Sequence, residues 1–416
     1  MLALAGRNNL PPPYPSPEAA RAAYNFSDLQ DFLDLYYYGA SVLRTRRDFF
    51  DLAMAYFKRA AAANVVRAEV FFDPQTHVQN GLAWSEFMGG LVAAAEAAEA
   101  GLGLSVAWIM CFRKDLSIED ADATLTAALP WLRRGIVAVG LDSSEAGHPP
   151  AAFAAVFERA AGLGLLAVAH AGEEGQPEYV WEALDVLHVR RVDHGVHCLD
   201  DPPLRQALVE RRVPLTVCPV SNLRLGVYPG QLPQRLSELV RTPGLLVTVN
   251  SDDAAYFGAY VEGNYEWLAQ VAGLGVADVA RLAMNSLEAS FIWGSSGGSV
   301  GGGGGLMSDE AGVGGEDLMS DGASGGGEGF GSEEGDVVDS SVALRGQVRV
   351  GVHEGGGKGA AMMRGRGVGR ADGGALGARA SWGPHRLAEL RARVAELAAQ
   401  AEAAMTSMAV EAGGRA

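Results

Sequence analysis

Short apolar runs alternate with helical stretches along residues 1–293 of the chain. The runs stay apolar from end to end, which is typical of parallel strands that are buried on both faces. The stretches between them, such as WSEFMGGLVAAAEAAEA and AAFAAVFERAAG, have the composition of helices. We expect seven strands, at residues 65–72, 104–112, 135–142, 165–172, 190–196, 213–220 and 245–252.

This repeated strand–helix order predicts an α/β fold built on a parallel sheet. Seven such units favour a (β/α)8 barrel over an open doubly wound sheet, and no Gly-rich dinucleotide-binding motif follows any of the runs. A complete barrel has eight strands, so the pattern predicts a TIM-type barrel that lacks one. The first and last strands should then face each other without pairing, because a missing neighbour leaves two open edges.

Residues 294–380 differ from the rest of the chain in their high glycine content. Of the 55 glycines, 30 lie between residues 294 and 380, where large apolar residues are few. Glycine loses more conformational entropy on ordering than any other residue, so this tract is expected to be a disordered insert. Residues 381–416 are expected to contain an amphipathic helix, whose apolar positions are Leu387, Leu390, Val394 and Leu397.

The overall composition argues against several classes of protein. The net charge of −17, from 33 Lys and Arg against 50 Asp and Glu, argues against a nucleic-acid-binding protein, which needs a basic surface. Three scattered cysteines argue against a disulfide scaffold and favour a reducing compartment, which we take to be the cytoplasm. No run of 18 apolar residues occurs, so we expect no membrane span, and the opening MLALAG is too short for the core of a signal peptide.

Polar residues cluster where several of the expected strands end. His170 and Glu173 follow the run 165–172, His194 follows the fifth run, and Asp252 and Asp253 follow the last. In a barrel of this kind the carboxyl ends of the strands form one mouth, where the chemistry takes place. These five side chains should therefore converge on a single site.

The residue types in these clusters suit a hydrolytic metal site. His170 and Asp252 offer an imidazole and a carboxylate, which are ordinary ligands of Zn²⁺. Glu173 stands three residues after His170, close enough to carry a proton at the same site without binding the metal. His194 could orient or deprotonate a water that the metal activates, and Asp253 could hold a substrate nitrogen.

Each of these residues also has a simpler explanation when taken alone. A single histidine at a strand end is more often part of structural hydrogen bonding, and the Asp252–Asp253 pair could cap a helix. It is the combination that favours a metal site. The residues kept in reserve or set aside are His77, His148 and His197 as further ligands, Cys218 and Ser221 as weak nucleophiles, and Tyr36, Tyr37 and Tyr38 as packing residues on a helix.

Six segments make the chain resemble the adenosine/adenine deaminase family, whose members are zinc hydrolases on a (β/α)8 barrel. They are FFDPQTH (71–77), GLDSSEAGHPP (140–150), AHAGEEG (169–175), RRVDHGVHCL (190–199), TVCPVSN (216–222) and TVNSDDAAYFGAYV (248–261). The resemblance runs over residues 1–293. HAGE, the HG of the fourth segment and SDD are shared across the family, whereas GLDSSEAGHPP and VDHGV favour its adenine deaminase branch.

The resemblance implies a role for each residue of the cluster. His170 and Asp252 would bind Zn²⁺, Glu173 would give a proton to the purine ring, His194 would activate water, and Asp253 would contact the substrate. The reaction implied is the hydrolytic deamination of adenine to hypoxanthine and ammonia in purine salvage. The partner is then a small purine rather than a nucleic acid or a membrane. The cytidine-type deaminases do not match, because their CxxC motif is absent.

Two departures from the family pattern shape these expectations. The family begins with a strand that ends in His-x-His and supplies two zinc ligands, but no histidine precedes His77, and MLALAGRNNLPPPYPS resembles the segment after that strand. We therefore expect an N-terminally truncated barrel without its first strand, with weak zinc binding and little activity. The second departure is the Gly-rich tract, because the family runs from sequence like NSLEASF (285–291) directly into a terminal helix. Adenosine deaminase and a non-catalytic purine-binding or interaction relative remain as alternatives.

Overall fold

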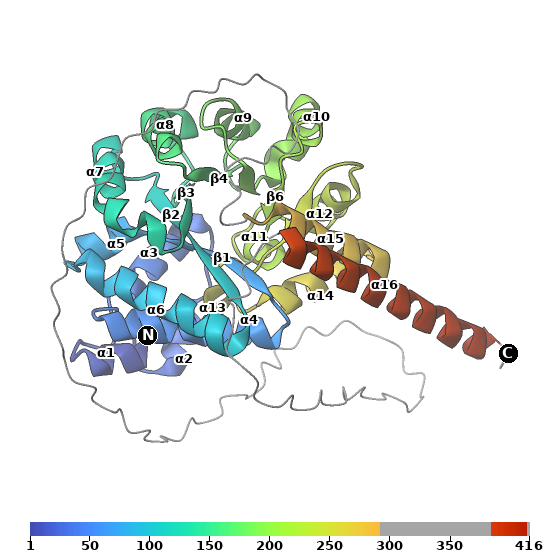
Figure 1. The fold of residues 1–416 in the computed structure, drawn as a ribbon, viewed down its shortest axis with the longest axis horizontal. Coiled ribbons are helices and arrows are strands. Elements are labelled where there is room, and N and C mark those ends of the chain that lie inside the picture. The colour runs from blue at the N-terminus through green and yellow to red at the C-terminus, as the bar shows by residue number, and fades with distance from the viewer. Residues whose placement is uncertain (292–383, 414–416) are drawn as a thin grey trace, which may run out of the picture. The chain divides into compact units, whose positions relative to one another are not determined.

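Seven parallel strands form one curled sheet, and helices surround it (Figure 1). The structure is a computed structural model that describes residues 1–291 and 384–413. The expected Gly-rich insert at 294–380 lies outside the described residues. Neighbouring strands in the sheet follow the order of the chain, from β1 to β7. The fold class expected from the sequence, an incomplete (β/α)8 barrel, is confirmed.

Strands β4 to β7 end before the apolar runs that predicted them, because the last residues of those runs belong to the loops at the mouth. The strands are β1 (Arg67–Phe72), β2 (Ser105–Arg113), β3 (Ile136–Asp142), β4 (Leu166–Ala171), β5 (Arg191–His194), β6 (Leu215–Val217) and β7 (Val247–Val249).

Helices precede, connect and follow the strands. Those before β1 are α1 (Leu2–Arg7), α2 (Pro17–Ala23), α3 (Leu29–Ala40) and α4 (Arg46–Ala62). Those between the strands are α5 (Pro74–Gln79), α6 (Trp84–Leu102), α7 (Ile118–Ala128), α8 (Ala154–Gly162), α9 (Pro177–Asp185), α10 (Pro202–Glu210), α11 (Pro219–Arg224) and α12 (Leu232–Arg241), with the 3₁₀ helices η1 (Leu129–Arg134), η2 (Pro150–Phe153) and η3 (Val196–Asp200). Those after β7 are α13 (Ala254–Phe257), α14 (Val261–Ala272), α15 (Val276–Ala289) and α16 (Pro384–Gly413).

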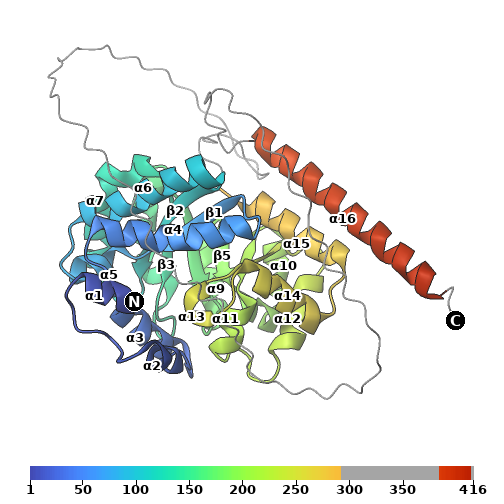
Figure 2. The same ribbon diagram turned by 90° about the horizontal axis from the view of Figure 1, so that it is seen from below.

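The expected terminal helix is present as α16, which lies beside α15 (Figure 2). Arg391 of α16 forms an ion pair with Glu288 of α15 at 3.3 Å. In the described parts of the chain, no helix combines the length and the apolar character that crossing a bilayer requires.

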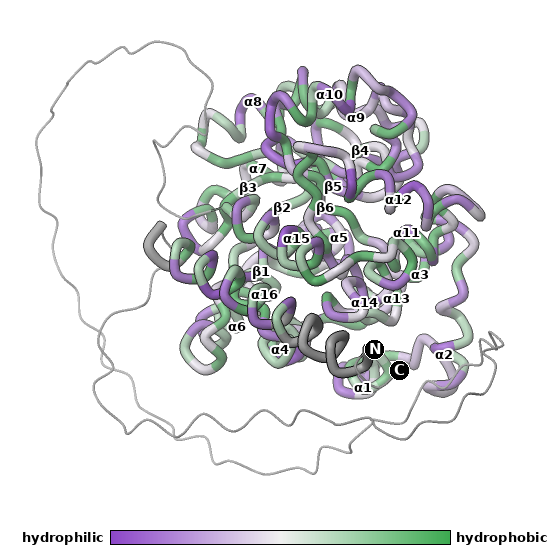
Figure 3. The backbone as a smooth tube through the Cα atoms, turned by 90° about the vertical axis from the view of Figure 1, so that its right-hand side faces the viewer, coloured by the Kyte–Doolittle hydropathy of each residue, from purple (hydrophilic) through white to green (hydrophobic). Residues whose placement is uncertain are grey.

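Strand β2 shows how the sequence divides the core into two layers. Trp108, Met110 and Phe112 are buried in the large cluster shared with the helices. The residues that alternate with them, Ile109 and Cys111 among others, belong to a smaller cluster inside the barrel. Successive side chains of a strand point to opposite faces, so a run that is apolar throughout serves both layers. Figure 3 accordingly shows hydrophobic stretches along the central strands.

A buried ionic network lies inside the curled sheet, centred on Glu69. Glu69 of β1 pairs with Arg67 and Arg191, and one of its oxygens accepts the backbone N–H of Phe291 at 2.6 Å. The Arg191 guanidinium lies 3.9 Å from the centroid of the Phe291 ring. Buried charges are tolerated when they are paired and hydrogen-bonded in this way. The network fixes the chain after α15 against β1 and β5.

The sheet does not close into a complete barrel. β1 pairs with β2 alone and β7 with β6 alone, and within residues 1–291 and 384–413 no strand joins β1 to β7. A cavity of about 1390 Å³ is lined by residues of both strands, by α4 and α15, and by the polar residues at the strand ends. The mouth of the barrel is therefore continuous with the gap between β1 and β7.

Replacing His77 by Phe should make the fold less sensitive to acid. The His77 ring packs against Phe49 and Phe87, at centroid distances of 4.7 and 5.3 Å, and its Nδ1 has no partner. Burial lowers the pKa of His77 to about 4, against about 6.5 in an unfolded chain, so its contribution to stability is complete above pH 6.5 and is lost as the pH falls towards 4.

From the linkage relation, His77→Phe should reduce the loss of unfolding free energy between about pH 7.5 and pH 5 by about 2 kcal/mol. Urea unfolding at the two pH values measures this difference. His188→Gln, at an exposed position, is the control and should keep the wild-type dependence. An unchanged dependence in His77→Phe would contradict the account.

Candidate active site

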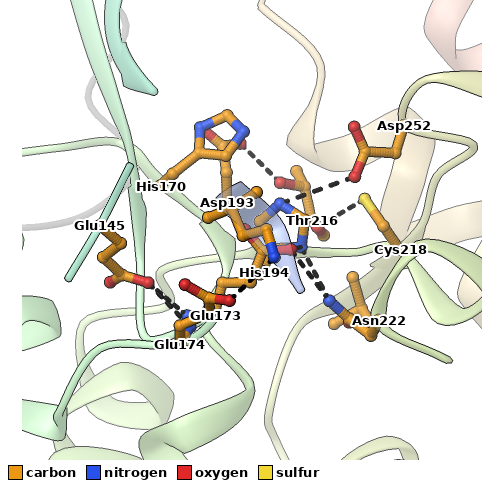
Figure 4. Close-up of polar contacts among 12 residues, drawn as sticks. Glu145, His170, Glu173, Glu174, Asp193, His194, Thr216, Cys218, Asn222 and Asp252 are labelled. Atoms are coloured by element: carbon orange, nitrogen blue, oxygen red, sulfur yellow. Dashed lines mark hydrogen bonds and ion pairs between the residues drawn. The ribbon is translucent and has the colours of Figure 1, made fainter. Parts of the chain in front are cut away.

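The carboxyl ends of the strands bring all five expected site residues into one cavity. His170 and Glu173 come from the end of β4, His194 from β5, and Asp252 and Asp253 from the loop after β7. Figure 4 shows His170, Glu173, His194 and Asp252 gathered around a common space. The expected convergence is thus present in the structure, whereas the chemical role of each residue stays a prediction.

Left-handed backbone conformations turn the chain sharply at this mouth. His194 has φ 59° and Asp252 has φ 53°, and Gly195 follows with φ 64°. Residues other than glycine rarely adopt positive φ, and such strain persists only where the surrounding structure imposes it. The conformational strain at His194 and Asp252, which both lie at the mouth, is consistent with a functional site there.

One ring nitrogen of His170 is already engaged. Its Nδ1 lies 2.9 Å from the carbonyl oxygen of Leu141 and 3.5 Å from a carboxylate oxygen of Asp193. Since a carbonyl oxygen can only accept, Nδ1 carries the proton and Nε2 keeps its lone pair. An N–H donated to a backbone carbonyl is the arrangement that orients metal-binding histidines in proteins.

His194 is the centre of the polar contacts. Its Nδ1 lies 3.4 Å from Glu173 Oε1 and 3.2 Å from the side-chain nitrogen of Asn222, and its Nε2 lies 3.8 Å from Asp252 Oδ2. The rings of His170 and His194 are 5.0 Å apart. The carboxyl of Glu173, the imidazole of His194 and the carboxylate of Asp252 therefore lie in sequence along one side of the cavity.

Burial shifts the protonation of these groups in opposite senses. Desolvation lowers the pKa of His170 and of His194 to about 4, so both rings are neutral at neutral pH. Desolvation, followed by the charge of Asp252, raises the pKa of the Glu173 carboxyl well above its ordinary value. The same two causes raise the pKa of Asp253. The site thus combines neutral imidazoles, which can bind a metal, with a carboxyl whose raised pKa favours its protonated form.

Two groups of side chains among the described residues offer metal-binding atoms. In the first, His194, Cys218 and Asp252 place one ligand atom each within 4.8 Å of one another. The second consists of Asp73, Cys111 and Asp142. In that second group burial raises the pKa of both carboxyls, and Asp142 Oδ1 has no hydrogen-bond partner among the described residues.

Sequence reasoning missed several residues of the site. Cys218 was expected within a strand, but it lies just before α11, where its thiol faces the cavity. Asn222 of α11 is fully buried and bridges His194 and Glu173. Tyr36 and Tyr37, expected only to pack on a helix, also line the cavity. Position at a strand end, the criterion applied to the histidines, would have singled out Cys218 as well.

The simpler explanations of the site residues can now be compared with the structure. Asp253 precedes α13, yet its side chain makes no capping hydrogen bond. The reserve histidines belong to neither group of metal-binding atoms, and neither does His170, the histidine expected to bind the metal. His197 stacks on Tyr228 with ring centroids 4.4 Å apart, and the Nδ1 of His148 is buried without a partner.

Comparison with known proteins places this arrangement in a family. A sequence model of the adenosine deaminase family matches residues 1–296. The chain is 52% identical to an adenine deaminase of Trichlorobacter lovleyi over 293 residues, which cover 70% of this chain and 83% of that protein. It is 50% identical to an adenine deaminase of Stutzerimonas stutzeri over 293 residues, which cover 70% of this chain and 92% of that protein.

Solved structures give the same result. The crystal structure of adenine deaminase from Arthrobacter aurescens matches with a TM-score of 0.66 and 45% identity, over 70% of this chain and 89% of that one. An amidohydrolase from Burkholderia ambifaria, solved with bound Zn, has the same fold at a TM-score of 0.63 and 24% identity, over 71% of this chain and 82% of that one.

Proposed function

Because the chain belongs to the adenosine deaminase family of aminohydrolases, we propose that it hydrolyses adenine to hypoxanthine and ammonia with the help of zinc, as a step of purine salvage. The observation that carries the proposal is the contact of a proton-bearing carboxyl, Glu173, with a neutral imidazole, His194, beside Asp252. The similar adenine deaminases favour the free base over its nucleoside. All three cysteines are free and buried, which suits the reducing cytoplasm.

The side chains present fit a zinc ion. His170 would bind it through Nε2, since Nδ1 is held by Leu141, and Asp252 would bind it through its carboxylate. Cys218 offers a sulfur atom near Asp252 as a further donor. Nitrogen, oxygen and sulfur are the ligand atoms that zinc prefers. When bound, zinc lowers the pKa of water to about 7 and so provides a nucleophile at neutral pH.

Glu173 supplies the proton that the ring needs. Its carboxyl is buried, and burial raises its pKa, which favours the protonated form that can donate to N1 of adenine. Protonation of N1 withdraws electrons from C6 and lowers the cost of losing aromaticity when water adds there. Asn222 holds Glu173 Oε1 at 3.4 Å, which limits the directions that the carboxyl can take.

His194 orients the water that attacks C6. Because Asn222 and Glu173 occupy its Nδ1 side, its Nε2 side faces Asp252 and the open part of the cavity. From there it can hydrogen-bond to the water as the new C–O bond forms. Asp253 lies in the same cavity and would contact the imidazole edge of the purine.

A panel of substrates tests the proposed function. Ammonia release from adenine, adenosine and N6-methyladenine should be measured on the zinc-supplemented chain, and adenine should have the highest kcat/KM. A preference for adenosine would identify the alternative deaminase. Tight binding of adenine without ammonia release would favour a non-catalytic relative.

Glu173→Gln should lower kcat for adenine by about 10²–10⁴-fold with little change in KM, because the amide cannot deliver a proton to N1. Since burial raises the pKa of Glu173, wild-type activity should decline on the alkaline side as the carboxyl loses its proton, and the variant should lack that decline. Glu174→Gln is the control, because that carboxylate only accepts the backbone N–H of Leu29. Equal activity of Glu173→Gln and wild type would contradict the role.

His170→Ala should weaken zinc binding by at least about 10-fold, because it removes a nitrogen ligand, and chelation of the metal should stop turnover. Competition with a chromophoric chelator measures the affinity. His77→Phe is the matched control, since His77 lines the cavity but packs between aromatic rings. Zinc held equally well by His170→Ala would place the metal elsewhere, and the group around Asp73 and Asp142 would be examined next.

An added eighth strand should raise both zinc affinity and turnover. Within the described residues β1 and β7 each have one edge that no strand covers, and an eighth strand there could add zinc ligands to His170 and Asp252. A form extended at its N-terminus by a family-like strand that ends in His-x-His should bind zinc fully and deaminate adenine faster than the chain as it is. A second extended form that ends in Ala-x-Ala adds the strand without the histidines, so it separates the effect of strand pairing from the effect of the added zinc ligands. Full zinc occupancy and fast turnover without any extension would contradict this prediction.

A further inference from the structure

One buried carboxylate holds the loop that carries Glu173. Glu145, in the loop after β3, is 1% exposed. Its two oxygens accept the backbone N–H groups of four consecutive residues, Gly172, Glu173, Glu174 and Gly175, at 2.5, 3.0, 2.9 and 2.9 Å. Buried carboxylates seldom find so many donors in one segment, and hydrogen bonds to a charged acceptor are the strong ones.

The loop leaves space for this carboxylate. A Cβ on Gly175 would lie 2.5 Å from Glu145 Oε1, so any larger residue would displace the carboxylate. Gly172 has φ 70°, which turns the chain so that successive N–H groups point to one centre. Glycines at both ends of the segment therefore serve the contact with Glu145.

Lys114 supplies a positive charge on the same side of the loop. It is 2% exposed, and its Nζ donates to the carbonyl oxygen of His170 at 2.5 Å. Burial by itself would raise the pKa of Glu145, but the charge of Lys114 and the backbone N–H groups hold it below the usual value. Glu145 is thus an anion at neutral pH and a fixed acceptor for the loop.

We propose that Glu145 is a positioning residue, which holds residues 172–175 so that the Glu173 carboxyl stays in contact with His194. The proposal rests on the proposed function, because Glu173 is the proton donor only in that reaction. In the described part of the chain the Glu145 side chain bonds to the backbone of residues 172–175 and not to His170 or His194, so it acts through the loop.

Two variants weaken the contact by different means. Glu145→Gln replaces one acceptor oxygen by an NH₂ group, so at least one backbone N–H loses its partner. Gly175→Ala leaves the charge of Glu145 intact but crowds its carboxylate, since the new Cβ would lie 2.5 Å from Glu145 Oε1 and 2.6 Å from the Tyr179 ring. Glu182→Gln is the matched control, because Glu182 Oε2 also accepts a backbone N–H, that of Ala151 at 3.0 Å, away from the mouth. Circular dichroism and thermal unfolding establish whether each variant is folded. If Glu145→Gln does not fold, Gly175→Ala still tests the proposal.

The first measurement is independent of catalysis. Amide hydrogen exchange in residues 172–175 should be at least about 10-fold faster in Glu145→Gln and Gly175→Ala than in wild type and the control. The ¹⁵N shifts of the His194 ring should move in both variants towards those of Glu173→Gln, because His194 loses its contact with the carboxyl. If amide exchange becomes faster but the ¹⁵N shifts of His194 do not change, Glu145 only stabilises the loop, and the proposal is overturned.

The second measurement uses the reaction. Both variants should lose about 100-fold in kcat for adenine, with KM altered by less than about 3-fold, since a displaced proton donor affects the transition state more than binding. Unchanged kcat in an active enzyme would overturn the proposal. If wild type does not deaminate adenine at all, the proposed function fails, and the exchange rates and His194 shifts still decide whether Glu145 positions Glu173.

Discussion

The parallel pairing of β4 with β5 sets the geometry on which the whole site depends. Its register places His170 opposite Asp193 and Ala171 opposite His194. The two histidines therefore reach the same end of the barrel with their rings 5.0 Å apart. A shift of one residue in this register would put His170 and Asp193 on opposite faces of the sheet, because strand side chains alternate. The apolar residues on both faces of these strands are what prevent that shift.

The same sheet explains why the site is open on one side. A parallel sheet of seven strands can be curled by its helices, but β1 and β7 remain unpaired with each other. The cavity consequently runs from the mouth into the gap, where side chains of α16 also line it. An electrostatic site works best when water is excluded, so pairing of these two edges would strengthen the site as well as the sheet.

The sequence was sufficient for the fold because each apolar run corresponds to one strand and each polar cluster to one strand end. It also predicted that five side chains meet at one mouth, although their chemical roles are still predictions: His170, Glu173, His194, Asp252 and Asp253. It could not reveal Glu145 or Asn222, because their partners lie about 30 to 50 residues away and include backbone N–H groups that carry no sequence pattern. Cys218 was misplaced because β6 ends at Val217, three residues earlier than the apolar run indicated.

The central claim is that the polar residues of the mouth form a zinc site that acts on adenine. Anomalous diffraction at the zinc edge, from crystals of the chain grown with zinc and adenine, tests it most directly. The account predicts one strong peak at about 2.0–2.2 Å from His170 Nε2 and from a carboxylate oxygen of Asp252, with the purine beside Glu173. A peak between Asp73 and Asp142 instead, or full zinc occupancy at a site without His170, would contradict it.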